Sequence, residues 1–426
     1  MDRTDTAGAA PTTDTAAEQL PEPTPLLQPA DGVPPLAVTA EEIAGAAAKL
    51  GAGSGPFAVD AERASGFRYS NRAYLIQIRR AGAGTVLIDP VNHGGSPIDA
   101  LAPLSEVLAE DEWILHAADQ DLPCLAEVGL RPPALYDTEL AGRLAGFERV
   151  NLAAMVHRLL GLGLAKGHGA ADWSKRPLPA AWLNYAALDV EVLLELRAAV
   201  GDVLADQDKT TWAAEEFEHL RRAEFAVTRR DRWRRTSGIH KVRTRAGLAA
   251  VRELWTARDQ IARNRDIAPG RILPDSAIVA AALADPKTES ELTALPVFGG
   301  QKQRRGARVW LDALAAARTD VDPPEISESL SGPPPPVRWA RRKPEAAARL
   351  EAVRSALTET SDRVRVPTEN LVSPELVRKL CWDWEQKPDT RAAVEDFLRE
   401  GGARSWQCEL AVPAVADALN RLGAQD

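Results

Sequence analysis

FAVDAERASGFRYSNRAYLIQIRRAGAGTVLIDP, residues 57–90, is the stretch that decides the fold of the N-terminal part of this chain. It holds three short apolar runs, at 57–62, 73–80 and 85–90, and each is bounded by Gly, Asn or Pro. Runs of this length between turn-forming residues are typical of strands. The stretch therefore predicts three successive strands of one sheet.

The rest of the chain divides into an α/β part and a helical part. Apolar periodicity after the three strands predicts, in order, a helix near 98–109, a strand at 113–117, and helices at about 121–128, 137–146 and 151–161. We expect one α/β domain, followed by helical bundles in which strand signals no longer occur. The predicted boundaries are a tail at 1–38, an α/β domain at 39–205, a helical linker at 206–240, a bundle at 241–320, a Pro-rich linker at 321–338 and a second bundle at 339–426.

The composition indicates an ordinary globular protein. Hydrophobic residues make up 45% of the chain and charged residues 27%, and no apolar run is long enough to cross a bilayer. The first twenty residues carry acids and threonines where a signal peptide would need a basic start and an apolar stretch. The cysteines Cys124, Cys381 and Cys408 lack the close spacing of zinc sites or disulfide frameworks, so we expect them to be reduced and buried. We expect a soluble, cytoplasmic protein without membrane association.

Charge is segregated along the chain. The net charge of −9 argues against a uniformly basic surface, and part of it comes from the acidic, Pro-rich tail, which we expect to be disordered. Residues 221–245, in contrast, contain ten Lys or Arg and two acids. This basic stretch either contacts a phosphate backbone or is a solvated linker. The candidate nucleic-acid-binding residues within it are Arg229, Arg230, Arg232, Arg234 and Arg235.

The two helical bundles share a sequence pattern. Residues 265–283 and 363–380 each contain a helix end, a proline, an aliphatic pair and a second proline in the same order. This pattern indicates either an internal duplication or two unrelated bundles with the same loop punctuation.

Two pairs of polar residues lie at spacings that bring their side chains together. Asp60 and Glu62 are two apart on a predicted strand, so they leave the same face and can converge on one cation. Tyr185 and Asp189 are four apart on a predicted helix and project from one face. Each pair alone also fits an ordinary strand end or an amphipathic helix. Asp60 and Glu62, however, would repel each other at the end of an otherwise apolar strand unless a metal ion or a proton compensated them. An acid near the largely apolar surface around Asp189 also needs an explanation.

A fourth carboxylate follows the predicted strand at 113–117. Asp121 opens a helix in HAADQDLPCL, where an acid can also act as a helix cap, and Asp119 competes with it for either role. Phosphodiester cleavage needs charge neutralisation, an activated water and a stabilised leaving oxygen, and two divalent ions held by several carboxylates supply all three. Oxygen ligands favour Mg²⁺ or Mn²⁺ over zinc.

With these positions in view, the chain resembles the DEDD 3′-5′ exonucleases, in particular the tyrosine subclass that contains ribonuclease D. Three motifs carry the resemblance: FAVDAERASGFRYSNRAYLIQIRR with Asp60 and Glu62, WILHAADQDLPCL with Asp121, and YAALD with Tyr185 and Asp189. The intervening stretches DTELAGRLAGF and KGHGAADWSKRPLP are similar to that family as well. The resemblance implies a ribonuclease H-like α/β domain with a mixed sheet flanked by helices.

The resemblance also implies a role for each residue of the motifs. Asp60, Glu62 and Asp189 would hold one metal ion. Asp60 and Asp121 would mainly hold the other, and Tyr185 would orient the attacking water.

Other residues of the same stretches receive weaker assignments. Lys166 and Arg176 are candidates to contact phosphate, although Lys166 could equally be an ordinary surface residue. Trp173 is expected to pack rather than stack on a base, and His116 is expected to support the loop before Asp121.

The helical part resembles HRDC domains, which bind nucleic acid and follow the nuclease in ribonuclease D proteins. LWTARDQIARNRDIAPGRILPDSAIVAAA followed by LPVFGG carries this resemblance, and the bundle from Trp339 onward is expected to be a second HRDC-like domain. The resemblance implies RNA as the partner, specifically the 3′ ends of structured RNA such as tRNA precursors. We expect a monomer, although the sequence itself carries no signal for the oligomeric state.

The sequence therefore predicts a two-metal 3′-5′ exoribonuclease that releases nucleoside 5′-monophosphates. A DNA 3′-5′ exonuclease is one alternative, because related folds process DNA. A nucleic-acid-binding scaffold without catalysis is another, but the presence of all four acids and the tyrosine opposes it.

Overall fold

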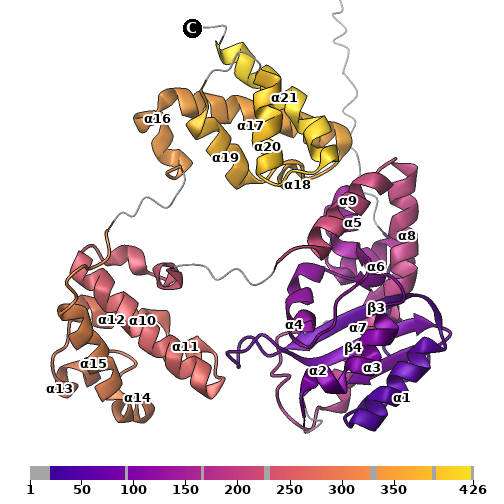
Figure 1. Ribbon diagram of the computed structural model, residues 1–426, viewed down its shortest axis with the longest axis horizontal. Helices are drawn as coiled ribbons and strands as arrows, with labels where there is room; N and C mark the ends of the chain where they lie inside the picture. The colour runs from indigo at the N-terminus through magenta and orange to yellow at the C-terminus, as the bar shows by residue number, and fades with distance from the viewer. Residues whose placement is uncertain are drawn as a thin grey trace, which may run out of the picture.

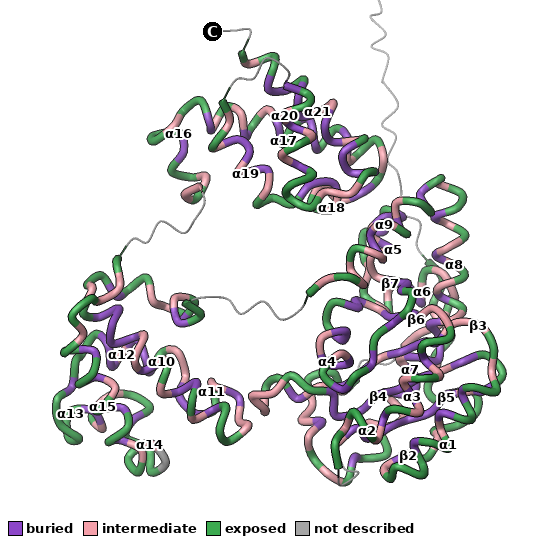
Figure 2. The backbone as a smooth tube through the Cα atoms, in the orientation of Figure 1, coloured by how far each residue is buried: buried purple, intermediate pink, exposed green. Residues whose placement is uncertain are grey.

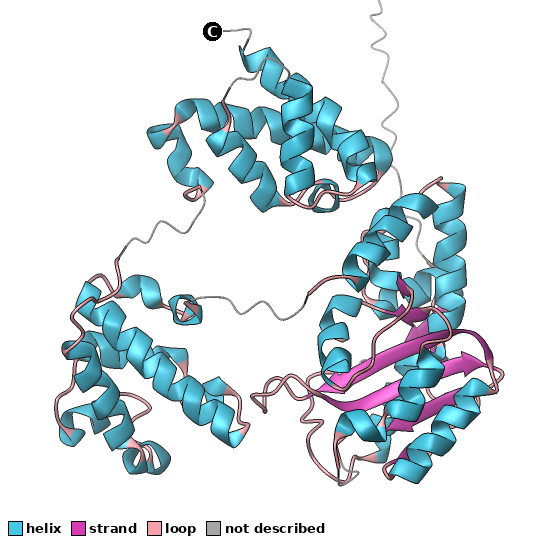
Figure 3. Cartoon of the chain, viewed as in Figure 1, coloured by secondary structure: helices cyan, strands magenta, loops and turns pink. Residues whose placement is uncertain are grey.

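The computed structural model describes residues 20–91, 95–164, 167–224, 231–326, 333–385 and 390–423. These residues form an α/β domain and two helical bundles (Figures 1 and 3). Among them, no helix is both long enough and apolar enough to span a membrane. The three cysteines are free and buried, as the sequence predicted.

A six-stranded mixed sheet forms the centre of the α/β domain, with the strand order β2-β5-β4-β3-β6-β7. Among β3, β4 and β5, neighbouring strands are antiparallel. Strands β6 and β7 run parallel to β3, and β2 runs parallel to β5. The three strands predicted from residues 57–90 are therefore confirmed. The strand bounds are β2 Leu36–Ala37, β3 Ser54–Arg63, β4 Ala73–Ala81, β5 Gly84–Ile88, β6 Trp113–Leu115 and β7 Leu135–Asp137.

Helices cover both faces of this sheet, and the alternation along β3 decides what each face carries. Phe57, Val59 and Ala61 point to the face covered by α1, α3 and α4. Ala58 points to the opposite face, which packs against α5, α6, α8 and α9, and Asp60 and Glu62 share that side because side chains alternate along a strand. The helix bounds are α1 Ala40–Gly51, α2 Pro97–Ala100, α3 Ala102–Leu108, α4 Leu122–Glu127, α5 Thr138–Leu144, α6 Leu152–Leu160, α7 Ala180–Glu191, α8 Leu193–Asp206 and α9 Thr210–Arg221.

The prediction that residues 1–38 form a disordered tail is wrong for residues 20–38, whereas residues 1–19 lie outside the described residues. Strand β1 (Thr24–Leu26) pairs in parallel with β8 (Leu162–Leu164), and β2 pairs with β5. Side chains of α7 hold the same segment, since Asn184 donates to the Leu27 carbonyl at 2.9 Å and Glu191 accepts from the Ala30 amide at 3.1 Å. A Pro-rich segment can be ordered in this way because an edge strand needs only part of its backbone groups to pair.

The two helical bundles repeat one pattern. A helix of 21 residues, a helix of 4 and a helix of 10 follow one another as α10, α11 and α12, and again as α17, α18 and α19. This correspondence supports the duplication reading of the sequence pattern. The bounds are α10 Arg245–Arg265, α11 Pro269–Ile272, α12 Asp275–Ala284, α13 Glu289–Thr293, α14 Gln301–Arg305, α15 Ala307–Arg318, α16 Trp339–Arg342, α17 Pro344–Val364, α18 Thr368–Leu371, α19 Pro374–Asp383, α20 Thr390–Glu400 and α21 Ser405–Gly423.

Both bundles contact the α/β domain through the residue that follows their 21-residue helix. Asp266, with φ of 46°, accepts a hydrogen bond from the Ser70 amide at 2.8 Å. Arg365, with φ of 52°, offers its carbonyl to the buried ammonium of Lys209 at 3.4 Å. The second bundle is held further by Glu216 of α9, which accepts from the guanidinium of Arg404 and the indole of Trp406. Each bundle is thus fixed to the α/β domain by its own set of contacts, and buried residues line each of the three cores (Figure 2).

Candidate active site

Three of the predicted carboxylates meet at the sheet. Asp60 and Glu62 leave the same face of β3, and Asp189 faces them from α7. One oxygen from each of the three lies within 4.8 Å of the others, an arrangement that can hold a metal ion. Helix α7 approaches the sheet closely because Ala186 and Ala187, which are fully buried, face it. The cluster lines a cavity of about 400 Å³.

Asp121 adds a fourth carboxylate to the same cavity. It stands at the start of α4, yet its side chain makes no capping hydrogen bond. The side chain is buried instead and lies beside Asp60, close enough to share a proton with it. Asp119 is exposed and does not line the cavity. The geometry therefore favours Asp121 over Asp119 as the fourth ligand.

Tyr185 lies one helical turn before Asp189, and its hydroxyl faces that carboxylate. Gly167, in the segment before α7, packs against the tyrosine ring so closely that a Cβ built on it would lie 1.9 Å from a ring carbon. The imidazole of His168 adds an edge contact, with ring centroids 5.9 Å apart. The ring of Tyr185 thus packs between its own helix, α7, and residues 167–168.

Burial and mutual repulsion strongly perturb these acids. Burial first, and then the charges of Asp60 and Asp189, raise the pKa of Glu62 to about 9. The pKa values of Asp121 and Asp189 are also raised, by burial and then by the charge of Asp60. Burial, followed by the charge of Asp189, raises the pKa of the Tyr185 hydroxyl, which is therefore neutral at pH 7. Without a cation, the cluster holds protons at neutral pH.

This electrostatic state predicts that metal binding releases protons. Glu62, with a pKa of about 9, is protonated at pH 7 and must lose its proton to become a ligand. We expect about one proton or more to be released per protein at pH 7. Mn²⁺ affinity should accordingly increase as the pH rises towards 9. Isothermal titration calorimetry in two buffers of different ionisation enthalpy measures the number directly, and an identical heat in both buffers contradicts the prediction.

The same shift has a defined consequence for the stability of the metal-free protein. The pKa of Glu62 is raised above its unfolded value of 4.5, so the folded state binds the proton more tightly. This stabilising contribution is fully present below pH 4.5 and is lost as the pH rises through 9.

Three further residues position the site and were not singled out in the sequence. Gln77, in the first, apolar part of strand β4, pairs opposite Asp60 and donates to its Oδ2 at 2.5 Å. Asp137 caps α5 and also accepts the amides of Ala117 and Ala118, which fixes the turn leading to Asp121. The sequence contained a signal for each of these two residues. Gln77 is an amide within an apolar stretch, and Asp137 is an acid followed by Thr-Glu at the start of a predicted helix.

Arg63 is the third residue, and its guanidinium compensates part of the negative charge. Its Nε lies 3.4 Å from Oδ1 of Asp121, and the side chain lines the cavity. The charge of Arg63 lowers the pKa values of both Asp121 and Glu62, against the larger effect of burial.

His116 and Trp173 agree with their expected structural roles. The Nδ1 atom of His116 lies 2.9 Å from the Thr138 hydroxyl, and burial lowers the pKa of the imidazole to about 4. It also lines the cavity as a neutral group. Trp173 is fully buried and packs against Trp182, with ring centroids 5.1 Å apart.

The hypothesis that Arg176 contacts phosphate does not agree with its surroundings. Its guanidinium pairs with the fully buried Asp89, at 2.5 Å and 2.9 Å, and donates to the carbonyls of Tyr74, Trp173 and Lys175. These contacts occupy all three guanidinium nitrogens, so Arg176 ties the segment before α7 to the sheet. Lys166 lies outside the described residues.

The basic stretch is also only partly described, because Arg229 and Arg230 fall outside the described residues. Arg232 and Arg235 are exposed, and Arg232 lies over the Trp255 ring. Arg234 donates to the Glu325 carbonyl at 3.2 Å.

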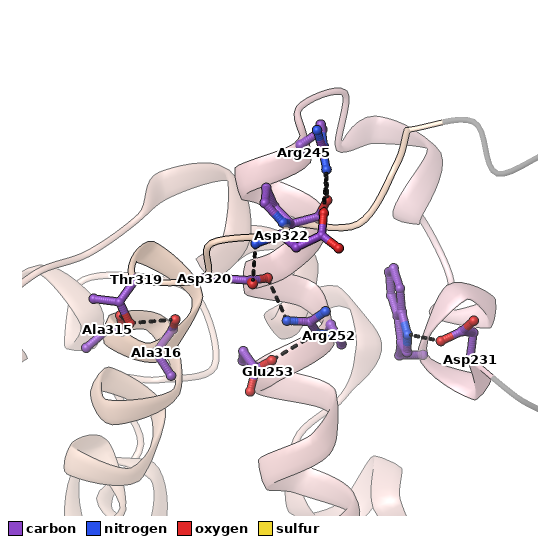
Figure 4. A network of polar contacts seen from close by, with 11 residues as sticks. Asp231, Arg245, Arg252, Glu253, Ala315, Ala316, Thr319, Asp320 and Asp322 are labelled. Carbon is purple, nitrogen blue, oxygen red and sulfur yellow. Dashed lines mark hydrogen bonds and ion pairs between the residues drawn. The ribbon is translucent and has the colours of Figure 1, made fainter.

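Two further arginines of the first bundle form ion pairs with the acidic segment that follows α15. Arg245 and Arg252 pair with Asp322 and Asp320, at 3.2 Å and 2.7 Å (Figure 4). The first bundle thus uses part of its basic charge internally.

Comparison with known proteins agrees with this geometry. The family model described as "3'-5' exonuclease" matches residues 35–205, the HRDC domain matches residues 247–314, and the "3' to 5' exonuclease C-terminal domain" matches residues 332–419. A protein crystallised from Bifidobacterium adolescentis is 36% identical, with a TM-score of 0.81 over 94% of this chain and all of that one. The crystal structure of RNase D from Escherichia coli, an exoribonuclease involved in structured RNA processing, shares the fold at 24% identity. Its TM-score is 0.67, over 91% of this chain and 98% of that one.

A curated relative decides the family. Ribonuclease D of Jannaschia sp. is 32% identical over 311 residues, which cover 70% of this chain and 78% of the relative. Sequence, fold and the carboxylate cluster all lead to the same assignment. This chain belongs to the ribonuclease D family of metal-dependent 3′-5′ exonucleases.

Proposed function

We propose that this enzyme removes nucleotides one at a time from the 3′ ends of RNA, using two divalent ions, Mg²⁺ or Mn²⁺. Asp60, Glu62 and Asp189 would hold one ion, and Asp60 and Asp121 the other. The observation that carries the proposal is the convergence of three carboxylates within 4.8 Å, with a fourth beside Asp60.

The donor set fits hard divalent cations. All four candidate ligands are carboxylates, which Mg²⁺ and Mn²⁺ prefer. Glu62 and Asp121 are buried and Asp60 and Asp189 are partly buried, so uncompensated negative charges are costly there. When bound, the ions supply a nucleophilic water near neutral pH and neutralise the phosphoryl group and the leaving oxygen.

The side chains of the chain itself perform the remaining tasks. Gln77 donates to Asp60 and fixes the orientation of that carboxylate. Tyr185, whose raised pKa keeps it protonated, has a hydroxyl available to orient the attacking water by hydrogen bonding, and cannot act as a base at neutral pH. Water adds to phosphorus and the 3′ oxygen of the preceding nucleotide leaves, so the product is a nucleoside 5′-monophosphate.

Two observations support structured RNA, such as tRNA precursors, as the substrate class. The relative from Escherichia coli is described as acting in structured RNA processing. The segment that precedes the HRDC domain also presents the exposed Arg232 and Arg235, where they can contact phosphate. We propose further that the enzyme acts as a monomer.

Matched 5′-labelled RNA and DNA oligonucleotides test the substrate. With Mg²⁺ or Mn²⁺, we expect the RNA to shorten from its 3′ end and to release 5′-monophosphates, with DNA degraded more slowly. Faster degradation of DNA points to a DNA exonuclease. Tight RNA binding without any shortening points to a scaffold that lacks catalysis.

A further inference from the structure

The loop between β3 and β4, residues 64–72, begins directly after Glu62 and Arg63. The pairing of β3 with β4 is irregular between these two residues, so the strand loses its regular register next to a metal ligand. Within the α/β domain, two side-chain hydrogen bonds anchor this loop, from Arg68 to the Ser174 hydroxyl at 2.8 Å and from Arg72 to the Tyr74 hydroxyl at 3.2 Å. The position of Glu62 therefore depends on what else holds the loop.

The first bundle supplies most of that support, and Figure 1 shows the loop reaching the end of α11. Asp266, at the end of α10, accepts hydrogen bonds from the Ser70 amide at 2.8 Å and from the Tyr74 hydroxyl at 3.3 Å. The Tyr69 hydroxyl donates to Asp259 at 3.1 Å. Backbone contacts add to these, since the Ala268 amide donates to the Phe67 carbonyl and Arg271 donates to the Gly66 carbonyl.

Aromatic packing extends the same connection to the catalytic tyrosine. Tyr69 packs against the hydrophobic core of the first bundle. Phe67, two residues earlier, packs in the cluster of the α/β domain that contains Trp173 and Tyr185. The loop therefore joins the bundle core to both sides of the active site, through Glu62 on β3 and Tyr185 on α7.

We propose that Asp266 of the HRDC domain is a positioning residue for the exonuclease reaction, because it holds the β3–β4 loop and thereby fixes Glu62 and Tyr185. This inference rests on the proposed metal-dependent function. It gives the first bundle a role in turnover that is separate from holding RNA. A short RNA that cannot reach the surface of the bundle should then still depend on Asp266.

Variants at position 266 distinguish the contribution of the Asp266 carboxylate from that of its backbone conformation. Asp266 has a φ of 46°, which glycine adopts without strain, so Asp266→Gly removes only the side-chain contacts. Asp266→Asn keeps one oxygen that can accept the Ser70 amide. Asp285 is a matched control, because it also ends a helix of this bundle with a φ of 45°, but its carboxylate pairs with Arg318 inside the bundle.

The experiment measures kcat and KM of the full chain on a 5′-labelled RNA trinucleotide at saturating Mn²⁺. We expect Asp266→Gly to lower kcat about tenfold, because small misplacements of catalytic groups cost that much or more, with KM little changed. Asp266→Asn should recover most of the loss, and Asp285→Gly should stay within about twofold of the wild type. Tyr69→Phe, which removes one hydroxyl, should lower kcat by a smaller factor and is the second variant if the glycine variant does not fold.

Three results overturn the inference. They are an unchanged kcat on the trinucleotide for both Asp266→Gly and Tyr69→Phe, a loss confined to KM on long RNA, and an equal loss of kcat in Asp285→Gly. Failure of the underlying function looks different, because Asp60→Asn would then remain as active as the wild type.

Discussion

Replacing Asp60 by Asn is expected to reduce exonuclease activity by about three orders of magnitude or more. Bound metal ions stabilise the transition state by several kcal/mol, and each 1.4 kcal/mol that is lost lowers the rate about tenfold. In the proposed two-ion site Asp60 would serve both ions, because it lies beside Glu62 and Asp189 and also beside Asp121. Gel-resolved degradation of a 5′-labelled RNA with Mn²⁺ measures the effect.

The fold should survive this substitution. Burial is the main factor that raises the pKa of Asp60, so a neutral side chain of the same shape relieves an unfavourable burial of charge. The melting temperature of the metal-free variant should therefore equal or exceed that of the wild type. Asp119→Asn is the matched control, because Asp119 is exposed and lies outside the cavity. Full activity of Asp60→Asn would remove the metal assignment, and a loss in Asp119→Asn would reopen the choice of the fourth ligand.

The second large effect is expected from adding a single methyl group at Gly167. A Cβ there would lie 1.9 Å from the Tyr185 ring, closer than any real contact, so the ring or the segment at 167–169 must move. A misplacement of about 1 Å in a catalytic group costs roughly 100-fold, and Tyr185 is the residue proposed to orient the attacking water. We therefore expect kcat of Gly167→Ala to fall by about that factor. Single-turnover kinetics at saturating enzyme report this step.

Metal binding should persist in this variant, because the four carboxylates are unchanged. Calorimetric titration with Mn²⁺ therefore separates a misplaced tyrosine from a collapsed site. Gly45→Ala is the control, since a Cβ at that position of α1 meets nothing within 4 Å. Wild-type kcat in Gly167→Ala would show that the tyrosine position does not limit the reaction.

Local periodicity accounts for the parts of the site that the sequence predicted. Strand alternation places Asp60 and Glu62 on one face of β3, and the helical repeat places Tyr185 one turn before Asp189. Both relations follow from backbone geometry over a few residues. For the same reason the three strands of residues 57–90 and the order of the helical bundles could be predicted.

Contacts between distant segments account for what the sequence left open or got wrong. The choice of Asp121 over Asp119 depends on the turn that Asp137 fixes from another strand. Arg176 turns to Asp89 rather than to a substrate because the sheet brings that buried acid to it. Residues 20–38 are ordered because their backbone finds partners at β8 and β5, which no local pattern reveals.

The sequence by itself thus indicated which carboxylates could hold a metal ion, because such a site requires carboxylates at spacings that single strands and helices impose. Only the tertiary structure decided how those residues are held. Gln77, Gly167 and Asp266 act through approaches of a few ångströms between segments far apart in the chain, and such approaches depend on how the sheet, α7 and the HRDC domain pack together.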